Sequence, residues 1–147
     1  MAASRLGNEV PAGATVATHR ITFSGRTAQF VVIASPGETF RAAGLVDPTI
    51  VVRAGTQVSI ELVNADCDMA HGLVVGAVGS ASSWMQVMAA APAFAGSALW
   101  LLGNTTSAGM HAGTLHFAAS TAGDYEYLCT VSGHAQKGMR GAFVVVG

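Results

Sequence analysis

The chain has 147 residues, of which 51% are apolar and 10% are charged, and its formal net charge is −1. This length is sufficient for a buried core, and we interpret residues 1–147 as a single domain. Sparse, balanced charge argues against binding to nucleic acid or to anionic membranes. No uncharged apolar run is long enough to predict a membrane span.

The N-terminal segment MAASRLGNEVPAG lacks the apolar stretch of a signal peptide. We expect residues 1–12 to form a poorly ordered extension ahead of the domain. Two locations are open at this point. The protein is either cytosolic, or an extracytoplasmic domain whose leader or anchor is not part of this chain.

The rest of the chain consists of short apolar runs separated by turn signals, which predicts an all-β protein. Residues 15–23 and 28–33 are predicted to form a first hairpin that turns at Ser24 and Gly25. Residues 57–63 alternate between apolar and polar side chains, the period of two that is typical of a half-buried strand. Further strands are predicted at residues 49–53, 72–75, 114–118, 124–129 and 142–146.

Many short strands with glycine-rich turns and little helical signal favour a Greek-key β-sandwich. The exception is the segment SASSWMQVMAAAPAF at residues 80–94, which predicts one short helical or irregular insertion. The sequence contains neither an internal repeat nor a sign of a second domain.

Three metal-ligating residue types follow one another near the C-terminus, in the run YLCTVSGHAQKGM. The predicted strand ends at Cys129, and the glycines after it permit a tight loop before the last strand. Such a loop can aim Cys129, His134 and Met139 at one point. The best candidate for a fourth ligand is His71, which follows a predicted strand and a short loop and opens the next apolar run.

Two imidazoles and one thiolate, with a weak axial thioether, form the ligand set of a blue-copper site. Thiolate and thioether sulfur suit Cu(I), whereas imidazole also suits Cu(II). A rigid scaffold that tolerates both oxidation states favours one-electron transfer. The ligand types therefore predict a single type 1 copper ion.

The segment YEYLCTVSGHAQKGMRGAFVVV resembles the C-terminal copper loop of cupredoxins, specifically those of the rusticyanin and sulfocyanin group. The spacing of four residues between Cys129 and His134, and again between His134 and Met139, is that group's loop length. Upstream, VNADCDMAHGLVV resembles the family's strand, loop and first ligand, which places this ligand at His71.

This resemblance implies a cupredoxin-like fold and a soluble monomer that is an electron carrier and not an enzyme. It implies transient contact with redox proteins of the cytochrome or oxidase type, and a periplasmic or extracytoplasmic location. In the family the imidazole edge of the C-terminal histidine passes the electron through an apolar surface patch. Here that role falls to His134, and Ala135, Gly138 and Met139 suit such a patch.

The chain departs from the family pattern in two places. Many cupredoxins carry Asn or Ser after the first histidine, and its side chain donates a hydrogen bond toward the copper thiolate. This chain has Gly72, so we expect no such side-chain hydrogen bond and do not carry over the high potential typical of rusticyanins. The second departure is Cys67, four residues before His71.

Several alternatives remain open. The methionine content allows a copper-binding carrier or storage module without a redox partner. Cys67 is interpreted as a free, partly buried thiol, with a disulfide to Cys129 or a zinc site of Cys67, His71, Cys129 and His134 as alternatives. His111 is the substitute if His71 is not a ligand, and His19 and His116 are interpreted as structural or surface residues.

The sequence also predicts tolerance of acid. It contains eight acidic residues, so few stabilising carboxylates can be lost as the pH falls. Burial of the ligand histidines would in addition oppose their protonation.

Overall fold

The computed structural model describes residues 8–78, 92–131 and 133–147, which form two β-sheets. The seven-stranded sheet contains, in spatial order, β1 (Ala14–Ala17), β2 (Arg20–Phe23), β6 (Thr49–Arg53), β12 (Arg140–Val146), β11 (Gly123–Leu128), β8 (His71–Ala77) and β9 (Ala98–Leu102). The five-stranded sheet contains β10 (His111–Ala119), β7 (Thr56–Asn64), β3 (Thr27–Ser35), β4 (Thr39–Ala42) and β5 (Leu45–Val46).

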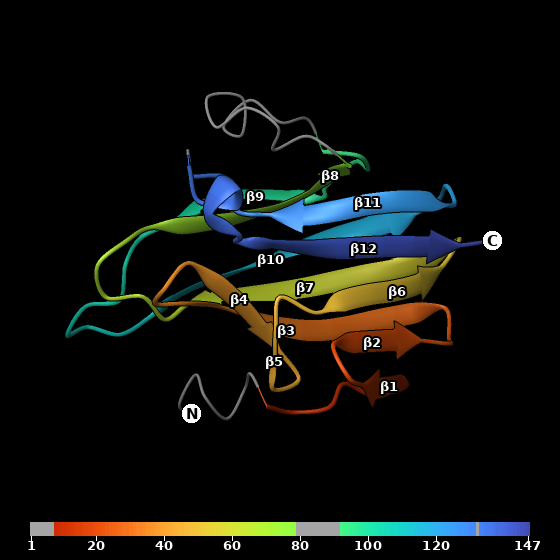
Figure 1. Cartoon of the computed structure of the whole chain (residues 1–147), viewed down its shortest axis with the longest axis horizontal. Helices are drawn as coiled ribbons and strands as arrows, with labels where there is room; N and C mark the ends of the chain where they lie inside the picture. The colour runs from red at the N-terminus through yellow and green to blue at the C-terminus, as the bar shows by residue number, and fades with distance from the viewer. Residues whose placement is uncertain (1–7, 79–91, 132) are drawn as a thin grey trace.

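The two sheets pack as the layers of a sandwich, and the chain crosses between them several times (Figure 1). Strand β6 pairs in parallel with β2 and β12, and β3 pairs in parallel with β7, while the other pairs are antiparallel. Parallel neighbours require connections that leave the sheet. The predicted all-β sandwich is confirmed.

The core lies between the sheets and follows from the alternation of side chains along each strand. In β7 the side chains of Val58, Ile60 and Leu62 are buried, whereas Gln57 and Glu61 are exposed. Burial of this apolar area is the main force that holds the two layers together. The same cluster of buried residues includes Cys129 and Met139, so the core reaches the candidate metal ligands.

The predicted hairpin of residues 15–23 and 28–33 is wrong. The first segment is interrupted at Thr18 and His19, where His19 has a φ of 61°, and its halves β1 and β2 pair with each other. A positive φ of this kind permits a tight turn between two strands. Strand β2 stays in the seven-stranded sheet, while β3 belongs to the other sheet beside β7.

Other predictions differ in detail. The strand predicted at residues 49–53 occurs with these bounds, the later predicted strands occur with ends shifted by up to three residues, and the short strands β4, β5 and β9 were not predicted. Most of the insertion expected at residues 80–94 lies outside the described residues, and residues 92–94 contain no helix. Residues 1–7 of the expected N-terminal extension also lie outside the described residues, and the first described strand begins at Ala14.

The sheet topology brings the ends of several strands to one end of the sandwich. Strands β8 and β12 both run antiparallel to β11, so the start of β8, the end of β11 and the start of β12 meet there. Figure 1 shows this meeting point at the left of the molecule, beside the short 3-10 helix η2 (Ala135–Lys137).

A buried hydrogen bond ties β11 to the link between β5 and β6. The hydroxyl of Tyr127 donates to the carbonyl of Pro48 over 2.5 Å, and both residues are buried. Burial, together with the negative charge of Asp47, raises the pKa of Tyr127 well above its ordinary value, so this hydroxyl stays protonated. Because Tyr127 lies two residues before Cys129, the bond also anchors the strand that carries the thiol.

We expect Tyr127→Phe to lower the free energy of unfolding by about 1–3 kcal/mol, because a buried carbonyl loses its donor. Urea denaturation of the metal-free protein measures this loss. The matched control is Tyr125→Phe, since the hydroxyl of Tyr125 donates to the carbonyl of Thr121 (2.8 Å) at the exposed surface. Equal losses in the two variants would contradict a special role for the buried bond.

Candidate metal centre

The four predicted ligands come from the strand ends that meet at one end of the sandwich. His71 is the first residue of β8, and Cys129 follows directly after the last residue of β11. His134 and Met139 lie on the loop between β11 and β12. All four side chains are buried, with exposed fractions of 0% for His71, Cys129 and Met139 and 7% for His134.

Three donor atoms form a compact triangle. The Sγ atom of Cys129 lies 3.7 Å from Nδ1 of His71 and 3.6 Å from Nδ1 of His134, and the two Nδ1 atoms are 3.3 Å apart. The centre of such a triangle is about 2 Å from each corner, the usual length of bonds from imidazole nitrogen or thiolate sulfur to a metal ion. The donor set of two imidazoles and a thiol fits copper.

Backbone hydrogen bonds bring Met139 back beside the start of the loop. The N–H of Met139 donates to the carbonyl of His134, and its carbonyl accepts from the N–H of Cys129, both over 3.1 Å. The turn of η2 and the left-handed φ of 106° at Gly138 allow the chain to reverse between His134 and Met139.

A buried carboxylate that the sequence analysis missed holds the first histidine. Oδ2 of Asp66 lies 2.8 Å from Nε2 of His71, and Asp66 is only 1% exposed. A carboxylate at this distance accepts a hydrogen bond from Nε2–H, which leaves Nδ1 with a free lone pair inside the triangle. The spacing NADCDMAH offers the acid, but nothing in it indicates that this side chain faces the ring.

The environment of Asp66 favours its ionised form. Burial acts to raise the pKa of Asp66, but the hydrogen bonds from His71 and from the backbone N–H groups of Asp68 and Met69 outweigh it. The pKa of Asp66 is therefore lower than the ordinary value, and the negative charge persists beside His71.

Backbone donors surround the thiol. Burial raises the pKa of Cys129, while the N–H groups of Gly72, Val131 and Thr130 act in the opposite direction by stabilising the thiolate. The N–H of Val131 lies 3.5 Å from Sγ. Gly72 thus lacks the side-chain donor found in many cupredoxins, as predicted, but its backbone contributes a donor instead.

Gly72 also occupies a position with no room for a side chain. A Cβ atom there would overlap Oγ1 of Thr130 and the backbone carbonyl of Trp100, and would approach the carbonyl of Leu99. The pairing of β8 with β9 is irregular between His71 and Leu73. The hydroxyl of Thr130 donates to the carbonyl of Trp100, and so it ties the loop after Cys129 to β9 in place of a side chain at residue 72.

The structure settles the roles considered for Cys67. Both cysteines are free, so a disulfide with Cys129 is not formed. Cys67 is exposed, which corrects the expected partial burial, and it does not belong to the group of His71, Cys129 and His134. The four-residue zinc site is therefore not supported by the arrangement.

The remaining histidines do not belong to the group of His71, Cys129 and His134. His111 at the start of β10 is exposed, so it is not needed as a substitute for His71. His116 is exposed and lies 2.8 Å from the hydroxyl of Ser59, and His19 is exposed at the turn before β2. Their interpretation as structural or surface residues agrees with the structure.

The apolar patch expected around His134 is partly wrong. Ala135 and Met139 have exposed fractions of 0% and pack inward, so they contribute no surface. Gly138 is exposed. Met139 packs into the core cluster that contains Cys129, and Ala135 packs against Val74 and Leu128, so neither side chain points outward.

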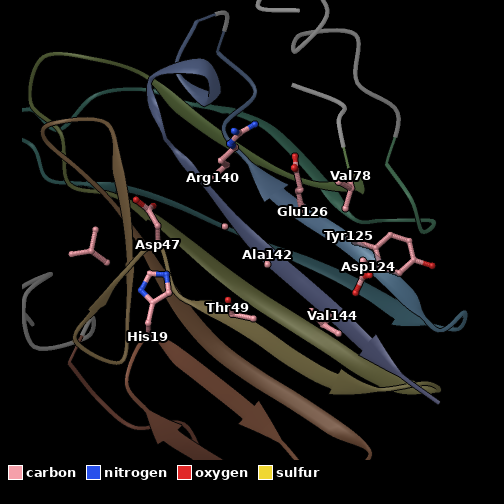
Figure 2. Close-up of a pocket in the computed structure, with 12 residues that line it drawn as sticks. His19, Asp47, Thr49, Val78, Asp124, Tyr125, Glu126, Arg140, Ala142 and Val144 are labelled. Atoms are coloured by element: carbon pink, nitrogen blue, oxygen red, sulfur yellow. The ribbon is translucent and has the colours of Figure 1, made fainter. Parts of the chain in front are cut away.

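A separate cavity of about 790 Å³ opens on the outer face of the seven-stranded sheet. Figure 2 shows its lining side chains, among them Glu126 on β11 and Arg140 on β12, with His19 and Asp47 across from them. None of the four predicted ligands lines it. The metal centre is therefore distinct from this cavity.

Comparison with known families agrees with this geometry. The family model described as the sulfocyanin (SoxE) domain matches residues 26–147. The chain belongs to the sulfocyanin family. Over 129 residues it is 30% identical to rusticyanin of Acidithiobacillus ferrooxidans and 29% identical to rusticyanin of Acidithiobacillus ferridurans. Each match covers 85% of this chain and 66% of the relative, slightly less than two thirds of the relative's length.

Solved structures show the same fold. Rusticyanin from Thiobacillus ferrooxidans superposes with a TM-score of 0.80 at 22% identity, covering 97% of this chain and 90% of that one. A reduced rusticyanin gives a TM-score of 0.79 at 23% identity, with coverage of 97% and 92%.

Family and donor set together define the cofactor. This rusticyanin- and sulfocyanin-like chain is a cupredoxin, and its cofactor is a type 1 copper ion. Among the residues that the structure describes, no helix has both the length and the apolar character needed to cross a membrane.

The crowding at Gly72 leads to a stability prediction. We expect Gly72→Ser to lower the free energy of unfolding of the metal-free protein by about 1–3 kcal/mol, because the new side chain overlaps backbone atoms that cannot move freely. The control is Gly25→Ser, where a Cβ would meet no atom within 4 Å. Chemical denaturation should show a change of at most about 0.5 kcal/mol for the control, and similar losses in both variants would contradict the interpretation.

The environment of His134 leads to a prediction about acid. Burial and, next, the positive charge of a protonated His71 lower the pKa of His134 from its ordinary value of 6.5. Protons therefore compete weakly with the metal for this nitrogen. We expect the visible band of the copper-loaded protein to persist down to about pH 4, which an absorbance titration measures.

The metal-free protein provides the matching control. As the pH falls, His134 takes up a proton in the unfolded chain near pH 6.5 but in the folded chain only at lower pH. The free energy of unfolding of the metal-free protein should therefore decrease below about pH 6.5. In His134→Gln this part of the pH dependence should disappear. A copper band lost well above pH 4, or an unchanged pH profile in the variant, would contradict the assignment.

Proposed function

We propose that this protein carries single electrons between redox protein partners of the cytochrome or oxidase type, by transient contact. In this proposal His71, Cys129 and His134 are the strong ligands of the copper ion, and Met139 is the weak axial ligand. The observation that carries the proposal is the buried triangle of two imidazole nitrogens and one thiol sulfur.

The scaffold around the triangle supports electron transfer. Bound copper supplies the one-electron couple between Cu(II) and Cu(I). His71 and Cys129 lie at the ends of paired strands, and the loop of His134 and Met139 is closed by backbone hydrogen bonds. Ligand atoms fixed in this way move little between the Cu(II) and Cu(I) states, which keeps the reorganisation energy of each electron transfer small.

The exposure of the three strong ligands differs in a way that suggests the path of the electron. His71 and Cys129 are fully buried, whereas 7% of His134 is exposed. We therefore propose that electrons enter and leave through the imidazole edge of His134.

The alternative of a carrier or storage module gains no support from the described residues. Exchange of a stored ion needs an accessible site, but the candidate ligands are almost completely buried. Of the methionines that motivated the alternative, Met110 is 38% exposed outside the ligand group and Met69 is half-buried. The other two methionines of this group, Met85 and Met88, lie outside the described residues.

Further parts of the proposal rest on the family resemblance. We propose that residues 1–147 act as a single domain, that the protein is a monomer without enzymatic activity, and that it works in the periplasm or elsewhere outside the cytoplasm.

Spectroscopy of the copper-loaded protein tests the function. We expect an intensely blue or green oxidised form that ascorbate bleaches reversibly, with the EPR spectrum of a type 1 site. A colourless protein that holds Cu(I) and releases it to weak chelators would overturn electron transfer in favour of storage.

Variants test the ligand roles. Cys129→Ser and His71→Ala should abolish the visible band, because each removes a strong donor. Met139→Ala should keep a band and change the reduction potential, since an axial thioether binds weakly. His111→Ala is the control, because its exposed ring lies outside the ligand group, and loss of colour in this variant would contradict the assignment.

A further inference from the structure

The carboxylate of Asp66 is held in place from several sides. Oδ1 accepts hydrogen bonds from the backbone N–H groups of Asp68 (2.9 Å) and Met69 (3.3 Å), and Oδ2 accepts from Nε2 of His71 (2.8 Å). Three donors thus converge on two oxygens in a residue that is 1% exposed.

The backbone of Asp66 is fixed as well. Its N–H donates to Oδ1 of Asn64 (2.9 Å), and its carbonyl accepts from the N–H of Thr105 (2.8 Å). The amide nitrogen of Asn64, itself buried, bridges to the carbonyls of Met69, Leu102 and Gly103 over 3.0–3.2 Å. The loop before His71 is therefore held by a connected network of hydrogen bonds, which fixes the position of the Asp66 carboxylate.

The convergence of donors explains why an acid stands here. An ionised carboxylate offers two acceptor oxygens, whereas the amide of an asparagine offers one oxygen and adds two N–H donors. An asparagine at residue 66 would either leave one side of the network without an acceptor or point its own N–H group at a donor. The site needs an acceptor-only group, and only Asp supplies one at this side-chain length.

We propose that Asp66 is a positioning residue that sets the reduction potential of the copper centre by holding His71 with a buried negative charge. The proposal rests on the proposed electron-transfer function. The hydrogen bond fixes the ring as the Nε2–H tautomer, aims Nδ1 at the triangle and makes that nitrogen a stronger donor. The charge, poorly screened in the buried site, favours the more positive Cu(II) state and so lowers the potential.

The decisive comparison uses two single-charge changes in the same loop. Asp66→Asn removes the buried charge and keeps the side-chain shape, whereas Asp68→Asn removes an exposed charge two residues away. The full chain is loaded with copper and titrated against a redox mediator. For Asp66→Asn we expect the ratio of reduced to oxidised protein at a fixed mediator potential to rise about tenfold or more, which is an upward shift of about 59 mV.

Asp68→Asn should shift the same ratio far less, because water and salt screen an exposed charge. Equal shifts in the two variants, or a fall in the potential of Asp66→Asn, would overturn the proposal. A merely structural role of Asp66 would change stability without this selective change in potential.

A measurement on the unaltered chain keeps the proposal testable if Asp66→Asn does not fold. In the metal-free protein, ¹⁵N NMR of the His71 ring should show a protonated Nε2 with a slowly exchanging proton. A ring protonated at Nδ1 instead would overturn the proposal. A colourless unaltered protein would refute the proposed function, whereas a blue protein with unshifted Asp66→Asn refutes the role of Asp66 alone.

Discussion

The fold of this protein is organised around three candidate metal-ligating atoms that are held together at the buried end of an apolar core. Two imidazole nitrogens and a thiol sulfur lie 3.3–3.7 Å apart, with almost no contact with water. Polar atoms gathered in this way gain little from one another in the absence of a metal, so the surrounding structure must hold them. The strand ends of β8, β11 and β12 and the closed loop between β11 and β12 do so.

The surroundings act on the two kinds of ligand in opposite electrostatic senses. Backbone N–H groups, among them that of Gly72, point at the sulfur of Cys129 and draw electron density from it. The carboxylate of Asp66 instead accepts a hydrogen bond from Nε2–H of His71 and increases the electron density of that ring. In many cupredoxins the side chain after the first histidine donates a hydrogen bond to the thiolate. Here backbone N–H groups act on the sulfur of Cys129 instead, and the carboxylate of Asp66 acts on His71.

Much of the fold was accessible from sequence because its signal is local. Alternation in residues 57–63 predicted a half-buried strand, and β7 shows this burial pattern. The assignment of strands to sheets was not accessible: residues 15–23 and 28–33 look like a hairpin, yet β2 and β3 belong to different sheets. Alternation shows that one face of a strand is buried but not against which neighbour, and the choice depends on pairing partners distant in sequence.

The sequence by itself determined the chemistry of the centre, because the residue types and loop spacing of Cys129, His134 and Met139 are set along a few residues of chain. It also indicated His71, through the resemblance of the segment before it. Only the tertiary structure showed that Asp66 faces the ring of His71, and that Thr130 occupies the space beside Gly72. Ligands on one loop are constrained by chain length, whereas these contacts depend on how the loop before β8, the end of β11 and the irregular edge of β9 pack together.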